Sequence, residues 1–245
     1  MQQYRADLHI HTLLSPCGDL EMSPANIVEV AAQKKIEILG IADHNSTKHA
    51  LLIQKLAAEK GIFALCGAEV TTREEVHCLT FFENIDALNQ FQQYLNEHIT
   101  KVKNNPKYFG HQVVVDEQEM IVEEIEYLLI SALDQSIEQV EKKVHELDGL
   151  FIPAHIDRPK YSLTSQLGFV PPDIKADALE ISRHTTKEEV LKKFPYLQSF
   201  TFTTSSDAHF PDDIGKKVCI FEMEALNFQE IKMALRGEKG RKVSF

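Results

Sequence analysis

One pattern recurs along the chain: a short apolar run that ends in polar or ionisable residues, followed by apolar positions at helical spacing. This alternation is typical of strand and helix units, and it predicts an α/β fold on a mostly parallel sheet. The first unit is the strand RADLHIHTLL at 5–14, followed by a helix that begins at Pro24 and is capped by Ser23. The second is the strand IEILGIADHN at 36–45, with a helix that ends at Gly61.

The rest of the chain is less regular. The apolar runs at 62–72 and 75–82 lie too close together for an intervening helix, so an antiparallel pair and an irregular excursion both stay open. From 87 to about 147 the pattern is helical and charged around a loop or hairpin, and we interpret it as a helical insertion. Strand patterns return at 149–158, 177–182, 200–209 and 216–224, and a last helix begins near Asn227.

The composition fits one globular domain. A chain of 245 residues with 43% hydrophobic residues can bury a full core, so residues 1–245 are expected to form a single domain. No signal peptide or membrane span is visible and the four cysteines are scattered, which predicts a cytoplasmic protein without a membrane partner. A net charge of −11 disfavours a broad surface for duplex nucleic acid, whereas small anionic substrates fit if bound cations reverse the local field.

Ionisable side chains gather where the predicted strands end. His9 and His11 are two residues apart in a strand, so they point to the same side and can share a metal ion. The other candidates, all expected at C-terminal strand ends, are Asp43, His44, Glu69, His77, His155, Asp207 and His209. The C-terminal ends of barrel strands meet on one face, so these side chains are expected to converge. Each alone has an ordinary explanation as a cap, ion pair or turn, but the whole set indicates a metal centre.

The remaining histidines are expected to serve no metal. His49, His98 and His145 lie on predicted helices, and His111 lies in the predicted insertion. Surface positions are the simplest interpretation for all four.

The order of the ionisable residues resembles the PHP (polymerase and histidinol phosphatase) superfamily. The four motifs of that superfamily are an HxH, a DH, a central histidine and a terminal DxH. The segments DLHIHTLL, ADHNS, FIPAH and SSDAH look like these motifs, and together they extend from Asp7 to His209. The resemblance implies a distorted (β/α)7 TIM-like barrel with two or three divalent ions, commonly manganese, zinc or iron.

The resemblance also implies three sets of metal ligands. They are His9, His11, Glu69 and Asp207 for one ion, Glu69, His77 and His155 for a second, and His44, His209 and a residue of the SPCGD loop for a third. That loop departs from the sequence that is more usual in the superfamily, so Asp19 and Cys17 both stay open as the last ligand. Asp19 is favoured, because ions that act on phosphates prefer oxygen ligands.

The function that the resemblance implies is the hydrolysis of phosphate esters by a hydroxide that the ions generate from water. Expected substrates are a small phosphorylated metabolite, a nucleotide or a short oligonucleotide end. The expected catalytic residues are Glu69, Asp207 and His209, with Arg158 and His184, next to Arg183, as phosphate contacts. Arg158 could instead pair with Asp157 or Asp173 at the rim of the site.

Two other functions stay open at this point. A PHP-like module without catalysis could hold its ions as structural elements and support a partner protein. A metal-dependent amidohydrolase also carries HxH on its first barrel strand, but this sequence offers no obvious lysine at a strand end to form a carbamylated bridge. The oligomeric state leaves no signal in the sequence.

Overall fold

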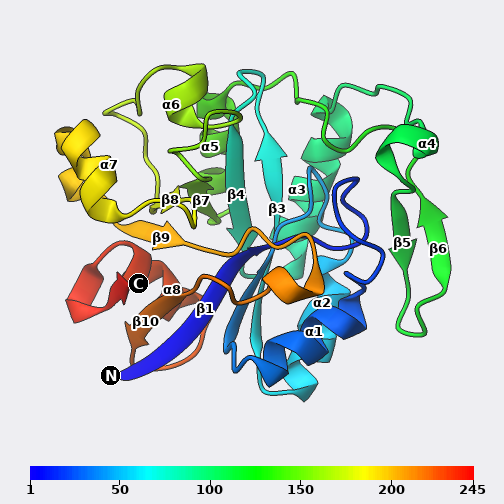
Figure 1. The fold of residues 1–245 in the computed structure, drawn as a ribbon, viewed down its shortest axis with the longest axis horizontal. Coiled ribbons are helices and arrows are strands. Elements are labelled where there is room, and N and C mark those ends of the chain that lie inside the picture. Colours follow the sequence, from blue (N-terminus) through cyan, green and yellow to red (C-terminus); the bar gives the residue numbers. More distant parts are fainter.

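A curled sheet forms the centre of the protein in the computed structural model, which describes all of residues 1–245 (Figure 1). Its strands lie in the order β11-β10-β1-β2-β3-β4-β7. Their bounds are Gln2–Ile10 for β1, Ile38–Ile41 for β2, Phe63–Thr71 for β3, His77–Phe82 for β4, Leu150–Pro153 for β7, Cys219–Met223 for β10 and Lys242–Ser244 for β11. Strands β1, β2 and β3 pair in parallel, as the alternating pattern predicts.

Two further strands complete the barrel wall, β8 at Leu179–Ile181 and β9 at Phe202–Thr204, which pair in parallel. Strand β8 follows β7, because the N–H of Ile156 donates to the carbonyl of Glu180 at 2.9 Å. Strand β9 leads back to β1, because the N–H of His11 donates to the carbonyl of Ala208 at 3.0 Å. The predicted distorted (β/α)7 TIM-like barrel is therefore confirmed.

Strand β4 runs against its neighbours. It pairs antiparallel with both β3 and β7, so the antiparallel pair is the correct one of the two predictions for 62–82. This reversal brings the first residue of β4 to the edge at which the parallel strands end. The distortion of the barrel thus places His77 at the face where the parallel strands end. In a parallel strand, the first residue would lie at the opposite end of the barrel.

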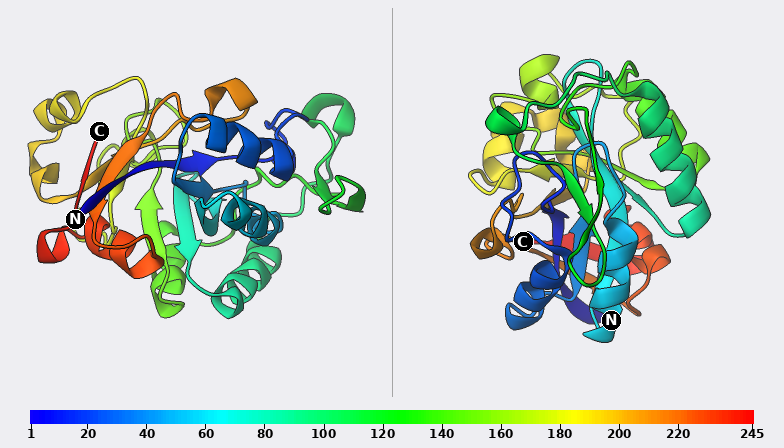
Figure 2. Two further views of the ribbon diagram at one scale, coloured as in Figure 1. Left: turned by 90° about the horizontal axis from the view of Figure 1, so that it is seen from below. Right: turned by 90° about the vertical axis from the view of Figure 1, so that its right-hand side faces the viewer.

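Helices cover the outside of the sheet (Figures 1 and 2). Their bounds are Pro24–Gln33 for α1, Ala50–Glu59 for α2, Ile85–His98 for α3, Pro106–Phe109 for α4, Ile137–Glu146 for α5, Leu163–Gln166 for α6, Lys187–Lys193 for α7 and Phe228–Leu235 for α8. The side chain of Ser23 accepts a hydrogen bond from the N–H of Asn26, and Pro24 opens α1, as predicted. None of the helices combines the length and apolar character that crossing a bilayer requires.

The hydrophobic core has two parts on the two faces of the sheet. Side chains of α1, α2, α3 and α5 pack on one face, in a cluster of 43 buried residues. The other face and α8 form a cluster of 18 buried residues, which includes Leu8, Leu65, Leu79 and Ile152. These four residues lie away from the strand ends that carry the ionisable side chains. Apolar packing therefore fills the interior of the barrel away from that end, and polar groups occupy the end itself.

The segment 87–147 contains most of α3, the short helix α4 and all of α5. Helices α3 and α5 contact β4 and β7 respectively. The connection between them carries an antiparallel hairpin, β5 at Val113–Val115 and β6 at Ile121–Glu124, which confirms a hairpin in this part of the chain. It projects from one edge of the molecule in Figures 1 and 2. The division of the chain into a domain with an insertion stays a prediction.

The buried carboxylate of Asp177 links β7 to the segment that leads into β8. The N–H of Phe151 donates to Oδ2 of Asp177 at 2.8 Å, and Nε of Arg236 donates to Oδ1 at 2.7 Å. Burial opposes ionisation of Asp177, but the hydrogen bonds from His145, Phe151 and Arg236 outweigh it and lower the pKa of this carboxyl. A lowered folded-state pKa means that ionised Asp177 adds stability above its unfolded pKa, and that this stability is lost as the pH falls.

We therefore predict that Asp177→Asn lowers the free energy of unfolding by about 2 kcal/mol near neutral pH, through loss of charge-assisted hydrogen bonds. The difference from the parent protein should shrink as the pH falls to the unfolded pKa of 3.8 and below. Urea unfolding at a series of pH values measures it. Asp173→Asn, at an exposed position, is the control and should stay close to the parent. A difference for Asp177→Asn that does not depend on pH would contradict this account.

Candidate metal centre

The carboxylate of Glu69 lies at the centre of a histidine cluster. Five imidazole nitrogens surround it, three near Oε1, from His9 at 3.2 Å, His77 at 2.9 Å and His155 at 3.1 Å, and two near Oε2, from His11 at 3.4 Å and His44 at 3.1 Å. All of these side chains are buried. Histidines from four separate parts of the chain therefore meet at one carboxylate, as the sequence predicts.

A second carboxylate lies beside the first. Oδ1 of Asp207 is 3.5 Å from Nε2 of both His9 and His11, and 3.7 Å from Nδ1 of His209. On its other side, Oδ2 of Asp207 pairs with the guanidinium of Arg158 at 2.5 Å. The partner of Arg158 is thus a residue of the cluster, not Asp157 or Asp173 at the rim.

A bulge in β1 turns its histidines toward the cluster. Ala6 faces Ile38 of β2, but Ile10 faces Ile41, so β1 uses one more residue than β2 between these pairs. Because side chains alternate along a strand, the extra residue reverses which of them face the barrel interior. Ile10 accordingly packs in the outer core, and His9 and His11 face inward beside Glu69.

The location of His77 differs from the prediction. The sequence suggested a C-terminal strand end, but His77 is the first residue of β4. It reaches the cluster because β4 is antiparallel to its neighbours. Two other members of the cluster have positive φ angles, 30° at His155 and 52° at Asp207. Such angles are unfavourable for residues other than glycine and concentrate at functional sites.

Charge holds the cluster together. Burial alone raises the pKa of Glu69, but nearby histidines, chiefly His77 and His9, outweigh it and hold that pKa well below its usual range. Burial opposes a charge on His9, yet Glu180 and Asp207 raise the pKa of its imidazole well above the ordinary value. At His209, burial and the neighbouring His11 lower the pKa to about 4. The negative charge of Glu69 and the imidazoles around it thus stabilise one another, and a metal cation can supply positive charge at the same place.

The donor groups fit divalent cations. Nε2 of His9 and Nε2 of His11 are 3.2 Å apart, so they can share one proton or face one cation. Nδ1 of His44 is buried without a hydrogen-bond partner. Three groups have donor atoms within 4.8 Å of one another: His9, His11 and Glu69; His44, Glu69 and His77; and His11, Cys17, His44 and His209. Imidazole, carboxylate and thiolate are the ligands that zinc, iron and manganese use in proteins.

Comparison with known families decides the identity. The PHP domain family matches residues 7–170, and the PHP-associated family matches residues 197–239. The chain belongs to the PHP family. The predicted resemblance is confirmed, and with it a metal-dependent fold whose histidine and glutamate clusters can bind metal ions.

Several known proteins are similar to this chain. The uncharacterized protein YqxK of Bacillus subtilis is 24% identical over 99% of this chain and 64% of its own length. The lesion-specific endonuclease EndoQ of Pyrococcus furiosus has a TM-score of 0.72 at 23% identity, over 99% of this chain and 58% of its own. A presumed metal-dependent phosphoesterase of Bifidobacterium adolescentis has a TM-score of 0.59 at 19% identity, over 87% of this chain and 91% of its own. The chain thus spans less than two thirds of the length of the first two proteins.

The PHP site has a supporting layer that the sequence argument missed. Oε2 of Glu180 accepts from Nδ1 of His9 at 3.0 Å and from the N–H of His155 at 3.1 Å. A carboxylate that binds the outer nitrogen of a ligating histidine fixes its tautomer and raises its basicity. The available signal was an acid between two apolar strand residues, Leu179 and Ile181, where a buried acid requires a partner.

We predict that Glu180→Gln weakens metal binding about 10-fold to 100-fold, because the orienting charge behind His9 is lost. The glutamine oxygen can still accept from Nδ1, so Glu180→Ala should weaken binding further. Titration of the metal-free protein with zinc, in competition with a chromophoric chelator, measures both. Equal zinc affinity in the parent and both variants would remove Glu180 from the supporting layer.

Asp43 and His49 support the PHP site from below. Oδ1 of Asp43 accepts from the N–H of Thr12 and from the hydroxyl of Ser15, both at 2.7 Å, and Oδ2 accepts from the hydroxyl of Thr12 at 2.8 Å. His49 was expected on the surface, which is wrong: it is fully buried, contacts the Thr12 hydroxyl at 2.8 Å and accepts from the N–H of Val115 at 3.0 Å. The Thr12 hydroxyl in the loop after β1 and the Val115 amide in the hairpin make its burial favourable. The pair therefore holds the loop after β1.

A cavity of about 260 Å³ opens onto the cluster. Its walls are Cys17, His44, Glu69, His77, Ile130, His155, Arg158, Tyr161, Asp207 and His209. Tyr161, another residue that the sequence argument missed, stacks on His77 at 4.8 Å. His184 is exposed and does not line the cavity, and the neighbouring Arg183 pairs with Asp213 at 3.4 Å. The structure therefore brings Arg158 to the site but not His184, because the chain turns outward after β8.

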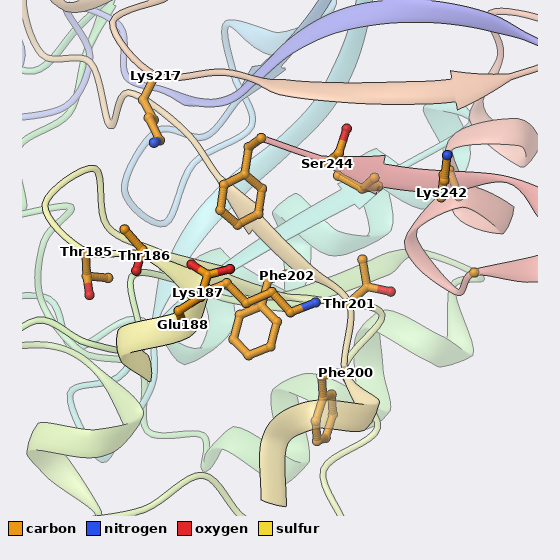
Figure 3. Close-up of a pocket in the computed structure, with 14 residues that line it drawn as sticks. Thr185, Thr186, Lys187, Glu188, Phe200, Thr201, Phe202, Lys217, Lys242 and Ser244 are labelled. Atoms are coloured by element: carbon orange, nitrogen blue, oxygen red, sulfur yellow. The ribbon is translucent and has the colours of Figure 1, made fainter. Parts of the chain in front are cut away.

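A larger cavity, of about 410 Å³, lies away from the PHP site (Figure 3). Lys187, Lys217 and Lys242 line it together with Phe202. Its lining includes one acidic residue, Glu188, and no histidine or cysteine. It therefore lacks the ligands for a metal centre.

Proposed function

We propose that this PHP domain hydrolyses phosphate esters with two or three divalent ions, manganese, zinc or iron. The observation that carries the proposal is the Glu69 carboxylate between five imidazole nitrogens, with Asp207 beside it. The proposed ligands are His9, His11, Glu69 and Asp207 for one ion, Glu69, His77 and His155 for a second, and His44 and His209 for a third. Bound there, the ions supply Lewis acidity and activate water.

The protein side chains supply position and charge. Both oxygens of Glu69 face imidazole nitrogens, which suits the carboxylate to bridge two cations. His209 donates Nδ1–H to the carbonyl of Asp207 at 2.9 Å, so its Nε2 is left with a free lone pair. The end of the cavity formed by His44, Glu69 and His155 is buried, which strengthens electrostatic interactions there.

A phosphate ester is favoured over the alternative substrates by the cavity walls. Arg158 lines the cavity, and its guanidinium, paired with Asp207, can turn to an anionic oxygen of a substrate. The bridging position holds Glu69, and no lysine lines the cavity, which disfavours an amidohydrolase with a carbamylated lysine. A non-catalytic module has no need of an open cavity beside its ions.

The class of phosphate ester is the finer part of the proposal. A volume of about 260 Å³ suits a small phosphorylated metabolite, a nucleotide or a short oligonucleotide end. The charge of −11 also disfavours long-range attraction of nucleic acid. The likeness to a lesion-specific endonuclease supports including oligonucleotides among the candidates.

The test combines metal analysis with a substrate panel. Protein purified without chelator is analysed for bound metals and assayed with phosphomonoesters, phosphodiesters and damaged oligonucleotides, with and without added manganese. Two to three equivalents of transition metal and metal-dependent phosphoester cleavage are expected. Bound metal without turnover on any ester would favour a structural module or an amidohydrolase, and absence of bound metal would overturn the ligand assignment.

Arg158 is proposed as a phosphate contact. Arg158→Ala should raise KM for the best substrate about 10-fold or more, because a hydrogen bond to a charged group contributes roughly 1.5–3 kcal/mol. Metal content should stay unchanged. The value of kcat should change little, because Arg158 is expected to bind the substrate and the transition state equally well, so its loss weakens both to the same extent. Arg183→Ala, with the same charge change outside the cavity, is the control. Unchanged KM for Arg158→Ala would refute the contact.

A further inference from the structure

One cysteine lies among the histidines of the cluster. The sulfur of Cys17 is part of the group in which the donor atoms of His11, Cys17, His44 and His209 lie within 4.8 Å of one another. Cys17 also lines the cavity, whereas the other three cysteines are buried elsewhere in the core. Asp19, favoured from sequence, is not in this group, and its Oδ1 accepts from the N–H of Glu21 at 2.8 Å instead.

The imidazoles facing Cys17 have nitrogen lone pairs to offer. His44 is 6% exposed, and its Nδ1, which lies 3.1 Å from Oε2 of Glu69, makes no hydrogen bond. His209 uses Nδ1 in its bond to the Asp207 carbonyl, which leaves Nε2 free. The rings of His11 and His209 stack at 4.4 Å, and those of His11 and His44 lie 4.6 Å apart. Three imidazoles and a thiol with donor atoms this close together have the composition of a metal-ligand set.

The loop that carries Cys17 is fixed by the backbone. The N–H of Gly18 donates to the carbonyl of Ser15 at 2.8 Å, and the N–H of Asp19 donates to the carbonyl of His209 at 2.9 Å. A Cβ at Gly18 would meet the carbonyl oxygen of Thr12 at 2.2 Å, so only glycine lets the loop pass this close. The loop therefore presents the Cys17 side chain to the cluster.

We propose that Cys17 is a thiolate ligand which, with His44 and His209, makes one position of this PHP centre selective for zinc. This inference rests on the proposed metal-dependent function. Thiolate with imidazole is a soft, tetrahedral donor set of the kind that zinc takes, while manganese and magnesium prefer oxygen. The two positions that share Glu69 have a carboxylate ligand and no sulfur. The metal positions of the centre therefore differ in their ligand chemistry. Oxygen-preferring ions should then be excluded from one position and accepted at the others.

Cobalt substitution gives a readout that does not depend on activity. The metal-free protein loaded with cobalt(II) should show a sulfur-to-cobalt charge-transfer band in the near ultraviolet. Cys17→Ser and Cys17→Asp should lose this band but keep the weaker visible bands of cobalt at the other positions. Cys66→Ser is the matched control, because Cys66 is buried and its thiol contacts the carbonyl of Ala50 at 3.4 Å, away from the cluster.

Competition between zinc and manganese tests the selectivity. The parent should retain one equivalent of zinc against excess manganese, and Cys17→Ser should bind that equivalent about 100-fold more weakly. Cys17→Asp should accept manganese in its place. Cobalt bound without a charge-transfer band in an active parent protein would overturn the thiolate ligand and leave the proposed function standing. Failure of the parent to bind any metal would overturn both.

Discussion

Replacing Glu69 with glutamine is expected to reduce phosphoester cleavage by at least about a thousandfold, the effect of losing several kcal/mol of metal-based transition-state stabilisation. The carboxylate faces five imidazole nitrogens and is the proposed bridge between two ions. A neutral amide of the same size keeps the shape of the site but removes the charge that two cations need. Bound metal should fall by at least one equivalent in elemental analysis, and kcat on the best substrate should fall with it.

The control for Glu69→Gln is Glu59→Gln. Glu59 is exposed on α2, so the same chemical change there should leave metal content and kcat at the parent values. Circular dichroism establishes that both variants are folded. A Glu69→Gln protein with full metal content and more than a tenth of the parent kcat would contradict the bridging role.

Removing the metal ions should lower stability as well as abolish cleavage. An ion present at about 1,000 times its dissociation constant stabilises the folded state by about 4 kcal/mol, because the scattered ligands do not form a site in the unfolded chain. For a chain of this size, Tm should fall by roughly 10 °C after dialysis against a chelator. Differential scanning calorimetry before dialysis, after it, and after zinc is restored measures the change.

The Glu69→Gln variant also serves as the control for metal removal. Because it already lacks part of its metal, the chelator should lower its Tm by less than that of the parent. A parent protein that keeps its Tm after loss of all bound metal would show that the ions do not stabilise the fold. Equal decreases of Tm in the two proteins would show that the ions bound by Glu69 contribute no stability.

Much of the fold and the cluster follows from local sequence. Short apolar runs and apolar positions at helical spacing predicted the alternating strands and helices, and Ser23 and Pro24 marked the start of α1. His9 and His11 share a face because strand side chains alternate, and the strands bring Glu69 and His155 to the same end of the barrel. These features depend on near neighbours in the chain and on a general property of barrels, so the sequence alone determines them.

Other features depend on contacts between distant parts of the chain, which local pattern does not contain. The reversal of β4 brings His77 to the cluster, and the bulge in β1 turns His9 and His11 inward. Glu180 supports His9 from 171 positions away, and the hairpin supplies the amide that makes the burial of His49 favourable. The path of one loop over Thr12 places Cys17, and not Asp19, beside His44 and His209. The sequence by itself thus determined most of the ionisable residues that meet in the cluster, and only the tertiary structure decided their partners and supporting residues, because burial and hydrogen bonding are set by packing.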